Sequence, residues 1–146
     1  MSEPEAITSF IGPYRFLSNF YPSPLVYQGL MFPTVEHAYQ SAKTMDPWIR
    51  REFTLIRLPA AAKRYGSRIK VRTDWEDVKL SIMLELLMKK FRDPRLAGLL
   101  LDTGHAELIE GNDWGDTFWG VCKGKGTNHL GNQLMLIRTT IRGNTQ

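Results

Sequence analysis

Residues 110–131 read EGNDWGDTFWGVCKGKGTNHLG, and this stretch predicts the most about the rest of the chain. It holds six of the twelve glycines and two of the four tryptophans, Trp114 and Trp119. Globular domains concentrate glycine where the backbone turns with positive φ or approaches another group closely. Two acids, Asp113 and Asp116, lie among these glycines. The mixture indicates a cleft that stacks a flat ring beside a carboxylate; the alternative is a glycine-rich turn whose tryptophans pack in the core.

Length and composition predict one globular domain with a single core, because the chain has 146 residues and is 42% hydrophobic. The lone Cys122 excludes an internal disulfide framework and suits a reducing compartment. The N-terminus lacks a basic segment followed by an apolar run, and no apolar run approaches the ~20 residues of a membrane span. We therefore expect a soluble, cytoplasmic protein with no membrane partner.

The charge balance favours anionic partners without choosing among them. The formal net charge is +4 and the pI is about 9.3. Such a balance suits nucleotides or nucleic acid. The lysines and arginines are spread along the chain with no block of five or six like charges, so the sequence does not indicate a nucleic-acid-binding tail.

Aromatic residues and prolines crowd residues 10–24, which predicts an irregular, rigid loop. This loop is either a packed N-terminal arm or one wall of a pocket. In the second interpretation Asn19 supplies a hydrogen-bonding group and Phe16 or Phe20 a stacking surface. Residues 25–32 predict two short strands that turn at Gln28-Gly29.

Thr34 predicts the N-cap of a helix that follows these strands. Along this helix Glu36, Gln40 and Lys43 recur at i, i+4 and i+7, so their side chains share one face. That face is either a solvent-exposed, salt-bridged stripe or one wall of a cleft that holds an acid–base group and an amine. The spacing alone leaves both interpretations open.

Four more helices are predicted before the glycine-rich stretch, at residues 47–56, 59–66, 75–91 and 94–101, with a short strand at 106–109. The third of these, with Asp74 as its cap, has the most apolar circumference and is predicted to be the central, most buried helix. Trp75 begins it, either in the core or at a pocket rim. Asp93 caps the fourth helix, and Asn128 is predicted to cap a final helix.

Two common nucleotide-binding motifs are missing from the chain. Gly124-Lys125-Gly126 precede a helix N-terminus, where backbone donors and the helix dipole can bind an anion. However, no hydroxyl residue follows the lysine as a P-loop requires, and no Rossmann glycine motif follows a strand, which disfavours a kinase or dehydrogenase. The three histidines are scattered, so no metal site is predicted.

Several spaced motifs occur in order along the chain. They are FLSNF at 16–20, FPTVEHAYQ at 32–40 with Lys43, WExVK at 75–79, KF at 90–91, the Thr103-Gly104 turn, and DxxWG at 116–120 running to GxNxLG at 126–131. Together they resemble the YbiA-like, or NADAR, domain family over about residues 10–142. One departure is Val121-Cys122-Lys123, where many relatives have a short polar or glycine-rich stretch.

The resemblance implies an α+β, predominantly α fold: a compact single domain spanning residues 1–146 with a few short strands. It also implies an N-glycosidase, a hydrolase of the C–N bond between a ribose anomeric carbon and an amine, with no cofactor. The preferred substrate is ADP-ribose on the exocyclic amine of guanine in nucleic acid, with DNA as a candidate partner. The alternatives are ribosylamino-pyrimidine phosphates of riboflavin biosynthesis, or a non-catalytic module that binds ADP-ribose or NAD. No oligomer is predicted.

Carried over by motif, the catalytic residues are expected to be Glu36, Lys43 and Asp116. Asp116 would lie beside the anomeric carbon and Glu36 would act as the acid–base group. Lys43 would either hold a phosphate or, as a neutral amine, form a transient Schiff base at C1. We expect the two carboxylates to meet across one pocket. The expected substrate-binding residues are Phe16, Ser18, Asn19, Phe20, Gln40, Trp75, Trp119, Gly120, Lys125, Gly126 and Asn128.

Overall fold

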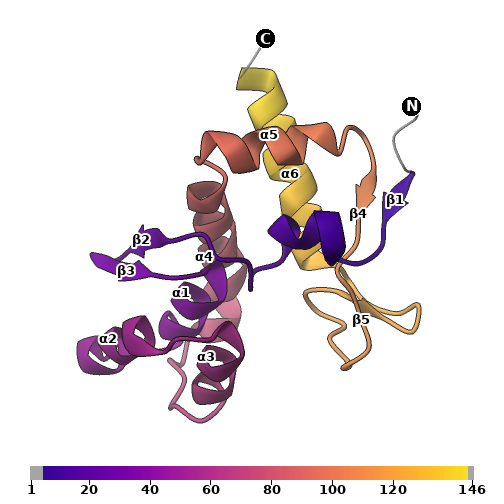
Figure 1. The fold of residues 1–146 in the computed structure, drawn as a ribbon. Helices are drawn as coiled ribbons and strands as arrows, with labels where there is room; N and C mark the ends of the chain where they lie inside the picture. Colours follow the sequence, from indigo (N-terminus) through magenta and orange to yellow (C-terminus); the bar gives the residue numbers. More distant parts are fainter. Residues whose placement is uncertain (1–4, 145–146) are drawn as a thin grey trace. The chain divides into compact units, whose positions relative to one another are not determined.

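The computed structural model describes residues 5–144, and helices dominate it (Figure 1). In chain order the elements are β1 (Ala6–Ile7), the 3₁₀ helix η1 (Gly12–Leu17), β2 (Leu25–Tyr27), β3 (Leu30–Phe32), α1 (Val35–Ser41), α2 (Pro47–Leu55), α3 (Pro59–Gly66), α4 (Trp75–Lys90), α5 (Pro94–Asp102), β4 (Glu107–Leu108), β5 (Gly111–Asn112), β6 (Val121–Cys122) and α6 (His129–Asn144). The predicted fold class, α+β and predominantly α, is confirmed. Among the described residues no helix has both the length and the apolar content to cross a bilayer.

The described residues group into two compact units. Residues 19–90 form one unit, and residues 5–18 with 91–144 form the other. We refer to residues 19–90, which contain the β2–β3 hairpin and helices α1 to α4, as the helical hairpin unit. We refer to residues 5–18 and 91–144, which contain the glycine-rich stretch, as the glycine-loop unit. The expectation of a single domain stays a prediction.

The helical hairpin unit begins with the antiparallel strands β2 and β3. Gln28 and Gly29 connect them with φ values of 52° and 78°. Two consecutive positive φ values are what a type I′ turn requires, and this turn matches the twist of the strands it joins. Leu25, Tyr27 and Phe32 are buried, so one face of the hairpin packs inward. The two strands and the turn predicted at residues 25–32 are confirmed.

Helix α1 is buried along its whole length. The Thr34 hydroxyl oxygen accepts a hydrogen bond from the backbone N–H of His37 at 3.1 Å, which confirms the predicted N-cap. The His37 ring donates from Nε2 to the Ile56 carbonyl, 2.8 Å away, and its Nδ1 lies 2.7 Å from the Thr34 hydroxyl. Since a carbonyl only accepts, this geometry holds one neutral tautomer. Burial also lowers the pKa of His37, which favours the neutral ring.

Helices α2 and α3 pack against one another and against α1. The Asp46 carboxylate accepts from the backbone of Trp48 at 2.8 Å and so begins α2. The rings of Phe53 and Tyr65 lie 4.9 Å apart and join α2 to α3. Both helices begin at the prolines from which they were predicted, Pro47 and Pro59.

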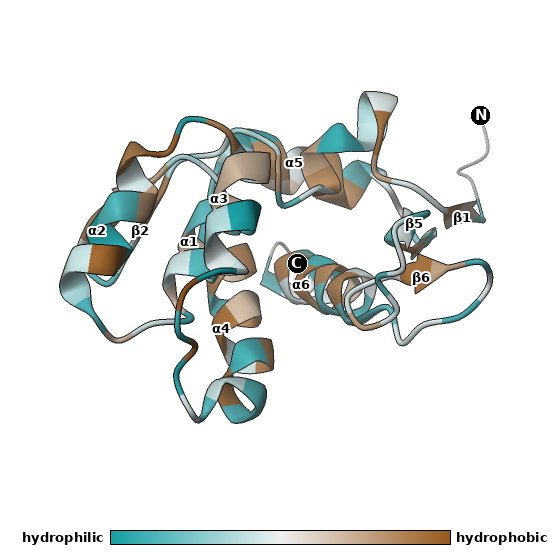
Figure 2. Cartoon of the chain, turned by 90° about the horizontal axis from the view of Figure 1, so that it is seen from below, coloured by the Kyte–Doolittle hydropathy of each residue, from teal (hydrophilic) through white to brown (hydrophobic). Residues whose placement is uncertain are grey.

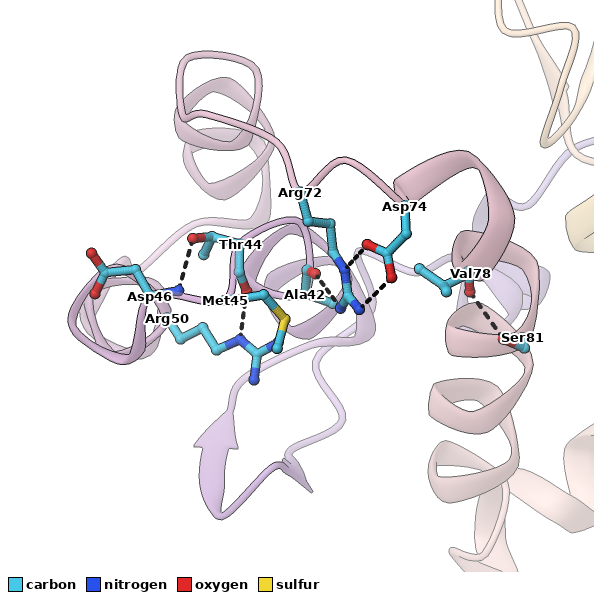
Figure 3. Close-up of polar contacts among 9 residues, drawn as sticks. All are labelled: Ala42, Thr44, Met45, Asp46, Arg50, Arg72, Asp74, Val78 and Ser81. Carbon is cyan, nitrogen blue, oxygen red and sulfur yellow. Dashed lines mark hydrogen bonds and ion pairs between the residues drawn. The ribbon is translucent and has the colours of Figure 1, made fainter.

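Two predictions about α4 are wrong. The Asp74 carboxylate does not cap the helix; it accepts from Arg72 Nε at 2.6 Å and Nη2 at 3.0 Å, because the guanidinium offers a better-matched pair of donors (Figure 3). Leu80 and Met88 are exposed, so α4 buries only part of its apolar circumference. The most buried helix is α1.

The glycine-loop unit contains two short parallel strand pairs, β1 with β4 and β5 with β6. Helix α5 begins at Asp93, whose carboxylate accepts from Arg95 N at 2.8 Å, and it packs against α6 (Figure 1). Helix α6 buries Leu130, Leu134 and Ile137, and Figure 2 shows both brown and teal around this helix. Residues 12–17, predicted as irregular loop, form η1 and bury Phe16 and Leu17.

Asn128 precedes α6 but does not cap it with its side chain. Its φ is 58°, and its amide oxygen accepts from Glu110 N at 3.0 Å while its amide nitrogen donates to Leu108 O at 2.9 Å. The side chain therefore ties the start of α6 to β4. The predicted cap is wrong because the Leu108 carbonyl and the Glu110 amide satisfy both ends of the Asn128 side chain.

Candidate functional site

Glu36 and Gln40 form a buried polar pair on α1. Gln40 Nε2 donates to Glu36 Oε1 across 2.8 Å. The residues are only 7% and 4% exposed, which rules out the interpretation of their face as a solvent-exposed stripe. The backbone N–H of Glu36 donates to the Asn19 carbonyl at 3.1 Å. A carboxylate held in this way, away from bulk water, is suited to acid–base chemistry.

Gly66, the last residue of α3, makes room for this pair. A Cβ at Gly66 would lie 1.9 Å from Gln40 Oε1, so no other residue fits here without moving Gln40. Gln40 Oε1 is buried and has no hydrogen-bond partner in the described structure. Since the Glu36 carboxylate needs a donor, the amide is oriented with its nitrogen toward Glu36 and its oxygen toward Gly66. Sequence reasoning missed Gly66, because a glycine that closes a helix is normally explained by the helix end alone.

Lys43 follows α1 and is half-buried. Burial lowers the pKa of its amine; nearby Lys63 and Lys79 lower it further, and Glu36 opposes them. The Lys43 carbonyl accepts from the Arg72 backbone N–H at 2.7 Å, so the segment before α4 holds this part of the chain in place. The arrangement increases the fraction of neutral amine, the form that acts as a nucleophile.

Two more predicted residues of this unit, Asn19 and Trp75, lie mostly inside it. Asn19 Nδ2 donates to Met83 Sδ at 3.5 Å, whereas Asn19 Oδ1 is buried and without a partner among the described residues. Trp75 is 8% exposed and packs on Tyr39 with ring centroids 5.1 Å apart. Trp75 therefore fills the interior of its unit here, and its part in substrate binding stays a prediction. Phe20 is half-buried.

Asp116 of the glycine-loop unit organises a tight turn. Its Oδ1 accepts from the backbone of Phe118 at 3.1 Å and of Trp119 at 2.9 Å. Its Oδ2 makes no hydrogen bond or ion pair with the described residues, so one carboxylate oxygen is structural and the other is available. Asp116 can thus stabilise the turn through Oδ1 and offer the negatively charged Oδ2 to a ligand.

Asn112 holds Asp116 in position. Its Oδ1 accepts from Asp116 N at 3.0 Å, and its Nδ2 donates to the carbonyls of Asp116 at 2.8 Å, Val121 at 3.3 Å and Glu110 at 3.4 Å. Sequence reasoning missed Asn112. The sequence could have indicated Asn112 only by its position in the glycine-rich stretch, four residues before Asp116. The carbonyls that it binds come together only when the loop folds.

The aromatic residues of the turn pack on one another. Trp119 is half-buried, with its ring 4.9 Å from that of Phe118 at 83° and 6.3 Å from that of His129 at 73°. Trp114 is exposed. The two tryptophans of this stretch therefore differ: Trp119 is anchored by its neighbours, and Trp114 lies in solvent.

Much of the backbone at the predicted anion site before α6 is already hydrogen-bonded within the protein, and anion binding there stays a prediction. The N–H groups of residues 127–130 donate to the carbonyls of Thr117, Gly120, Phe118 and Trp119, at 2.8 to 3.3 Å. Lys125 N donates to Cys122 O at 3.0 Å within a turn. Gly126 has φ of 147°, and a Cβ there would lie 2.1 Å from Gly120 O, so this glycine is needed for close backbone packing. An anion could be met here by the exposed Lys125 side chain instead.

The structure brings the predicted residues together in two sets. In the helical hairpin unit Glu36 and Gln40 are hydrogen-bonded, and Lys43 lies near enough for the Glu36 charge to affect its pKa. Asp116 and Trp119 share the turn of the glycine-loop unit. The buried Phe16 and half-buried Ser18 also belong to the second unit. The meeting of the two carboxylates across one pocket stays a prediction. Within residues 5–144 no three His, Cys, Asp or Glu side chains gather so as to hold a metal ion.

Comparison with known proteins identifies relatives along almost the whole chain. N-glycosidase YbiA of Escherichia coli is 39% identical over 129 residues, covering 86% of this chain and 80% of the relative. N-glycosidase Npun_R5314 of Nostoc punctiforme is also 39% identical, over 137 residues that cover 89% and 87% of the two chains. Riboflavin biosynthesis protein VVA0006 of Vibrio vulnificus is 35% identical over 135 residues, and this chain spans only 36% of its length.

The fold agrees with these similarities. The NMR structure of E. coli YbiA matches with a TM-score of 0.84 and 34% identity, over 97% of this chain and 88% of that one. The family model of the NADAR domain matches residues 8–142, which include both the Glu36 face and the Asp116 turn. The chain therefore belongs to the NADAR domain family.

Proposed function

We propose that this protein is an N-glycosidase that removes ADP-ribose from the exocyclic amine of guanine in nucleic acid. The general reaction class, hydrolysis of an N-glycosyl bond, is supported by the two relatives named N-glycosidase at 39% identity. The guanine specificity is the finer part of the proposal. The cytoplasmic location expected from the sequence stays a prediction.

The observation that carries the proposal is the buried Glu36–Gln40 pair next to the half-buried amine of Lys43. Cleavage of an N-glycoside develops positive charge at C1 and the ring oxygen, and the leaving amine must gain a proton. Glu36 is the proposed acid–base group, because its carboxylate is shielded from water and oriented by the Gln40 amide. A placed acid–base group contributes about 10²–10⁴-fold in rate.

Asp116 is the proposed electrostatic partner. Its Oδ1 is used by two backbone amides, which orient the carboxylate, and Oδ2 is available to face a developing cation. In the proposed active state Oδ2 lies beside the anomeric carbon. Trp119, held by Phe118 and His129, offers an aromatic surface for the base.

Lys43 has two candidate roles. As a cation it would hold a phosphate of the ADP-ribose. As a neutral amine it would attack C1 of the ring-opened sugar iminium; the guanine amine leaves with a proton, and water then hydrolyses the Lys43 imine and returns the free lysine. The lowered pKa of Lys43 supports the second role. Borohydride trapping of an adduct on Lys43 during turnover would establish it, and turnover without any trapped adduct would leave the phosphate role.

The direct test uses an oligonucleotide that carries ADP-ribosylated guanine. The proposal predicts release of free ADP-ribose and recovery of unmodified guanine. Binding of ADP-ribose without release would instead indicate a non-catalytic module. A parallel assay with ribosylamino-pyrimidine phosphates tests the second candidate function, which the similarity to VVA0006, a riboflavin biosynthesis protein, favours. Cleavage of the pyrimidine substrate alone would contradict the guanine specificity.

A further inference from the structure

The positive charge of the chain lies in one of its two units. Residues 19–90 contain twelve lysines and arginines against seven acids, a net charge of +5. The remaining residues contain seven against eight, a net charge of −1. The overall charge of +4 is therefore the sum of a basic unit, at +5, and a slightly acidic one, at −1.

Within the basic unit the charge concentrates further. Residues 50–72, which run from the middle of α2 through α3 and end before α4, hold eight cations and only one acid, Glu52. We call this stretch the basic segment. Glu52 is bound by the Tyr65 hydroxyl. Arg72 is neutralised by Asp74, and Arg50 turns back to donate to the Thr44 carbonyl at 2.7 Å (Figure 3).

The other cations of the basic segment point to solvent. Figure 2 shows hydrophilic residues, in teal, on both α2 and α3. Among the described residues no ion pair forms at these exposed side chains: Arg51, Arg57, Arg64, Arg68 and Lys70. The Phe53–Tyr65 contact holds α2, which carries Arg51, against α3, which carries Arg64. Neighbouring charges reinforce one another within a Debye length of about 8 Å at physiological salt.

An aromatic surface lies at one end of the basic segment. Trp48 is 74% exposed, although an indole is normally largely buried. It lines a surface hollow of about 420 Å³ together with Leu30 and Arg51. An exposed indole beside an unpaired guanidinium is the combination on which an unpaired base stacks while its phosphate is held.

We propose that the basic segment and the Trp48 hollow bind single-stranded nucleic acid, with phosphates on Arg51, Arg64 and Arg68 and one unpaired base on Trp48. This inference rests on the proposed function, since it names the polymer that carries the modified guanine. Arg51, Arg64, Arg68 and Trp48 are not among the proposed catalytic residues. Lys63 of the basic segment is electrostatically coupled to the proposed active site, because its positive charge lowers the pKa of the Lys43 amine.

Binding of a labelled, unmodified single-stranded oligonucleotide, followed by fluorescence anisotropy, tests the surface without catalysis. The triple variant Arg51→Glu, Arg64→Glu, Arg68→Glu should bind about tenfold or more weakly. Its plot of log K against log salt should be shallower by about 2, since each phosphate contact on a single strand adds about 0.7 to the slope. Replacing the same three residues by lysine keeps the charge and should preserve most of the affinity.

Two matched pairs locate the surface. Arg64→Glu should weaken binding, whereas Arg92→Glu, the same charge reversal at an exposed residue of the other unit, should not. Trp48→Ala should weaken binding more than Trp48→Phe, which keeps an aromatic face. Equal losses for Arg64→Glu and Arg92→Glu would mean that only net charge matters, and would overturn the proposed surface.

Cleavage assays separate this inference from the proposed function. The triple glutamate variant should lose kcat/KM on ADP-ribosylated guanine in an oligonucleotide but not on free ADP-ribosylated guanosine. If wild type cleaves neither substrate and the variant still loses oligonucleotide binding, the proposed function fails and the surface stands. If both are cleaved and charge reversal leaves oligonucleotide binding unchanged, the surface fails. Charge-dependent binding to phosphatidylserine vesicles but not to the oligonucleotide would assign the segment to a membrane surface instead.

Discussion

The side-chain amide of Gln40 is held between the carboxylate of Glu36 and the backbone of Gly66. Its nitrogen lies 2.8 Å from Glu36 Oε1, and its oxygen occupies the space that a Cβ at Gly66 would take. Gln40 therefore orients Glu36, the proposed acid–base group, and the position of Gln40 depends in turn on Gly66 at the end of α3. This relationship gives the first two predictions.

Glu36→Gln should lower turnover by about 10²–10⁴-fold, because an amide neither gains nor loses a proton at neutral pH. The free energy of unfolding should change little, since glutamine keeps an oxygen that can accept from Gln40. Turnover is measured by ADP-ribose release and stability by urea denaturation. Wild-type turnover in a folded Glu36→Gln protein would exclude Glu36 as the acid–base group.

Gly66→Ala should destabilise the protein by about 1–3 kcal/mol, because the new methyl group overlaps the buried Gln40 amide. Turnover should fall as well, because Gln40 moves and its hydrogen bond to Glu36 is broken. The double variant Gly66→Ala, Gln40→Ala removes the overlap, so it should regain stability without regaining turnover. Recovery of both together would show that Gly66 matters for packing alone.

Asp116→Asn separates the structural role of Asp116 in the turn from its proposed electrostatic role in catalysis. Asparagine keeps an oxygen for the amides of Phe118 and Trp119, so stability should hold while the loss of charge lowers turnover by about tenfold or more. Asp116→Ala removes the oxygen as well and should cost a further ~0.5–2 kcal/mol in unfolding free energy. Equal turnover in wild type and Asp116→Asn would assign Asp116 a structural role only.

Asn112→Asp should disrupt the turn around Asp116. A carboxylate cannot donate, so it would face the carbonyls of Asp116, Val121 and Glu110 without a hydrogen bond, at a cost of about 1–3 kcal/mol. As a positioning residue, Asn112 should affect kcat more than KM. Steady-state kinetics on the folded fraction give this split; a loss confined to stability would indicate no positioning role.

Lys90 should make stability depend on pH. Burial lowers the pKa of its amine to about 7 in the folded protein, while the unfolded value is near 10.5. The unfolded chain therefore binds more protons between these values, and the free energy of unfolding should rise with pH from about 7 to about 10. Lys90→Met should flatten this rise and be the more stable protein at pH 6. Lys89→Met removes one positive charge from the same helix end; an equal flattening there would exclude burial as the cause.

Sequence patterns predicted the elements that depend on neighbouring residues. Gln28-Gly29 predicted the hairpin turn, and Thr34 and Asp93 predicted helix caps, because each of these signals acts within a few residues. Asp74 and Asn128 carried equally good cap signals, yet their side chains bond to other partners. A cap prediction from neighbouring residues fails where a donor or acceptor from outside the helix start binds the capping side chain instead.

By itself the sequence determined the helical character, the caps with local partners, the spacing of Glu36, Gln40 and Lys43, and the family motifs. Only the tertiary structure decided that Glu36 and Gln40 are buried, that Gly66 makes room for them, and that Asn112 holds Asp116. It also decided that the positive charge gathers in one unit. The reason is physical: spacing sets which side chains share a face, but burial and long-range hydrogen bonds depend on what other segments pack against that face.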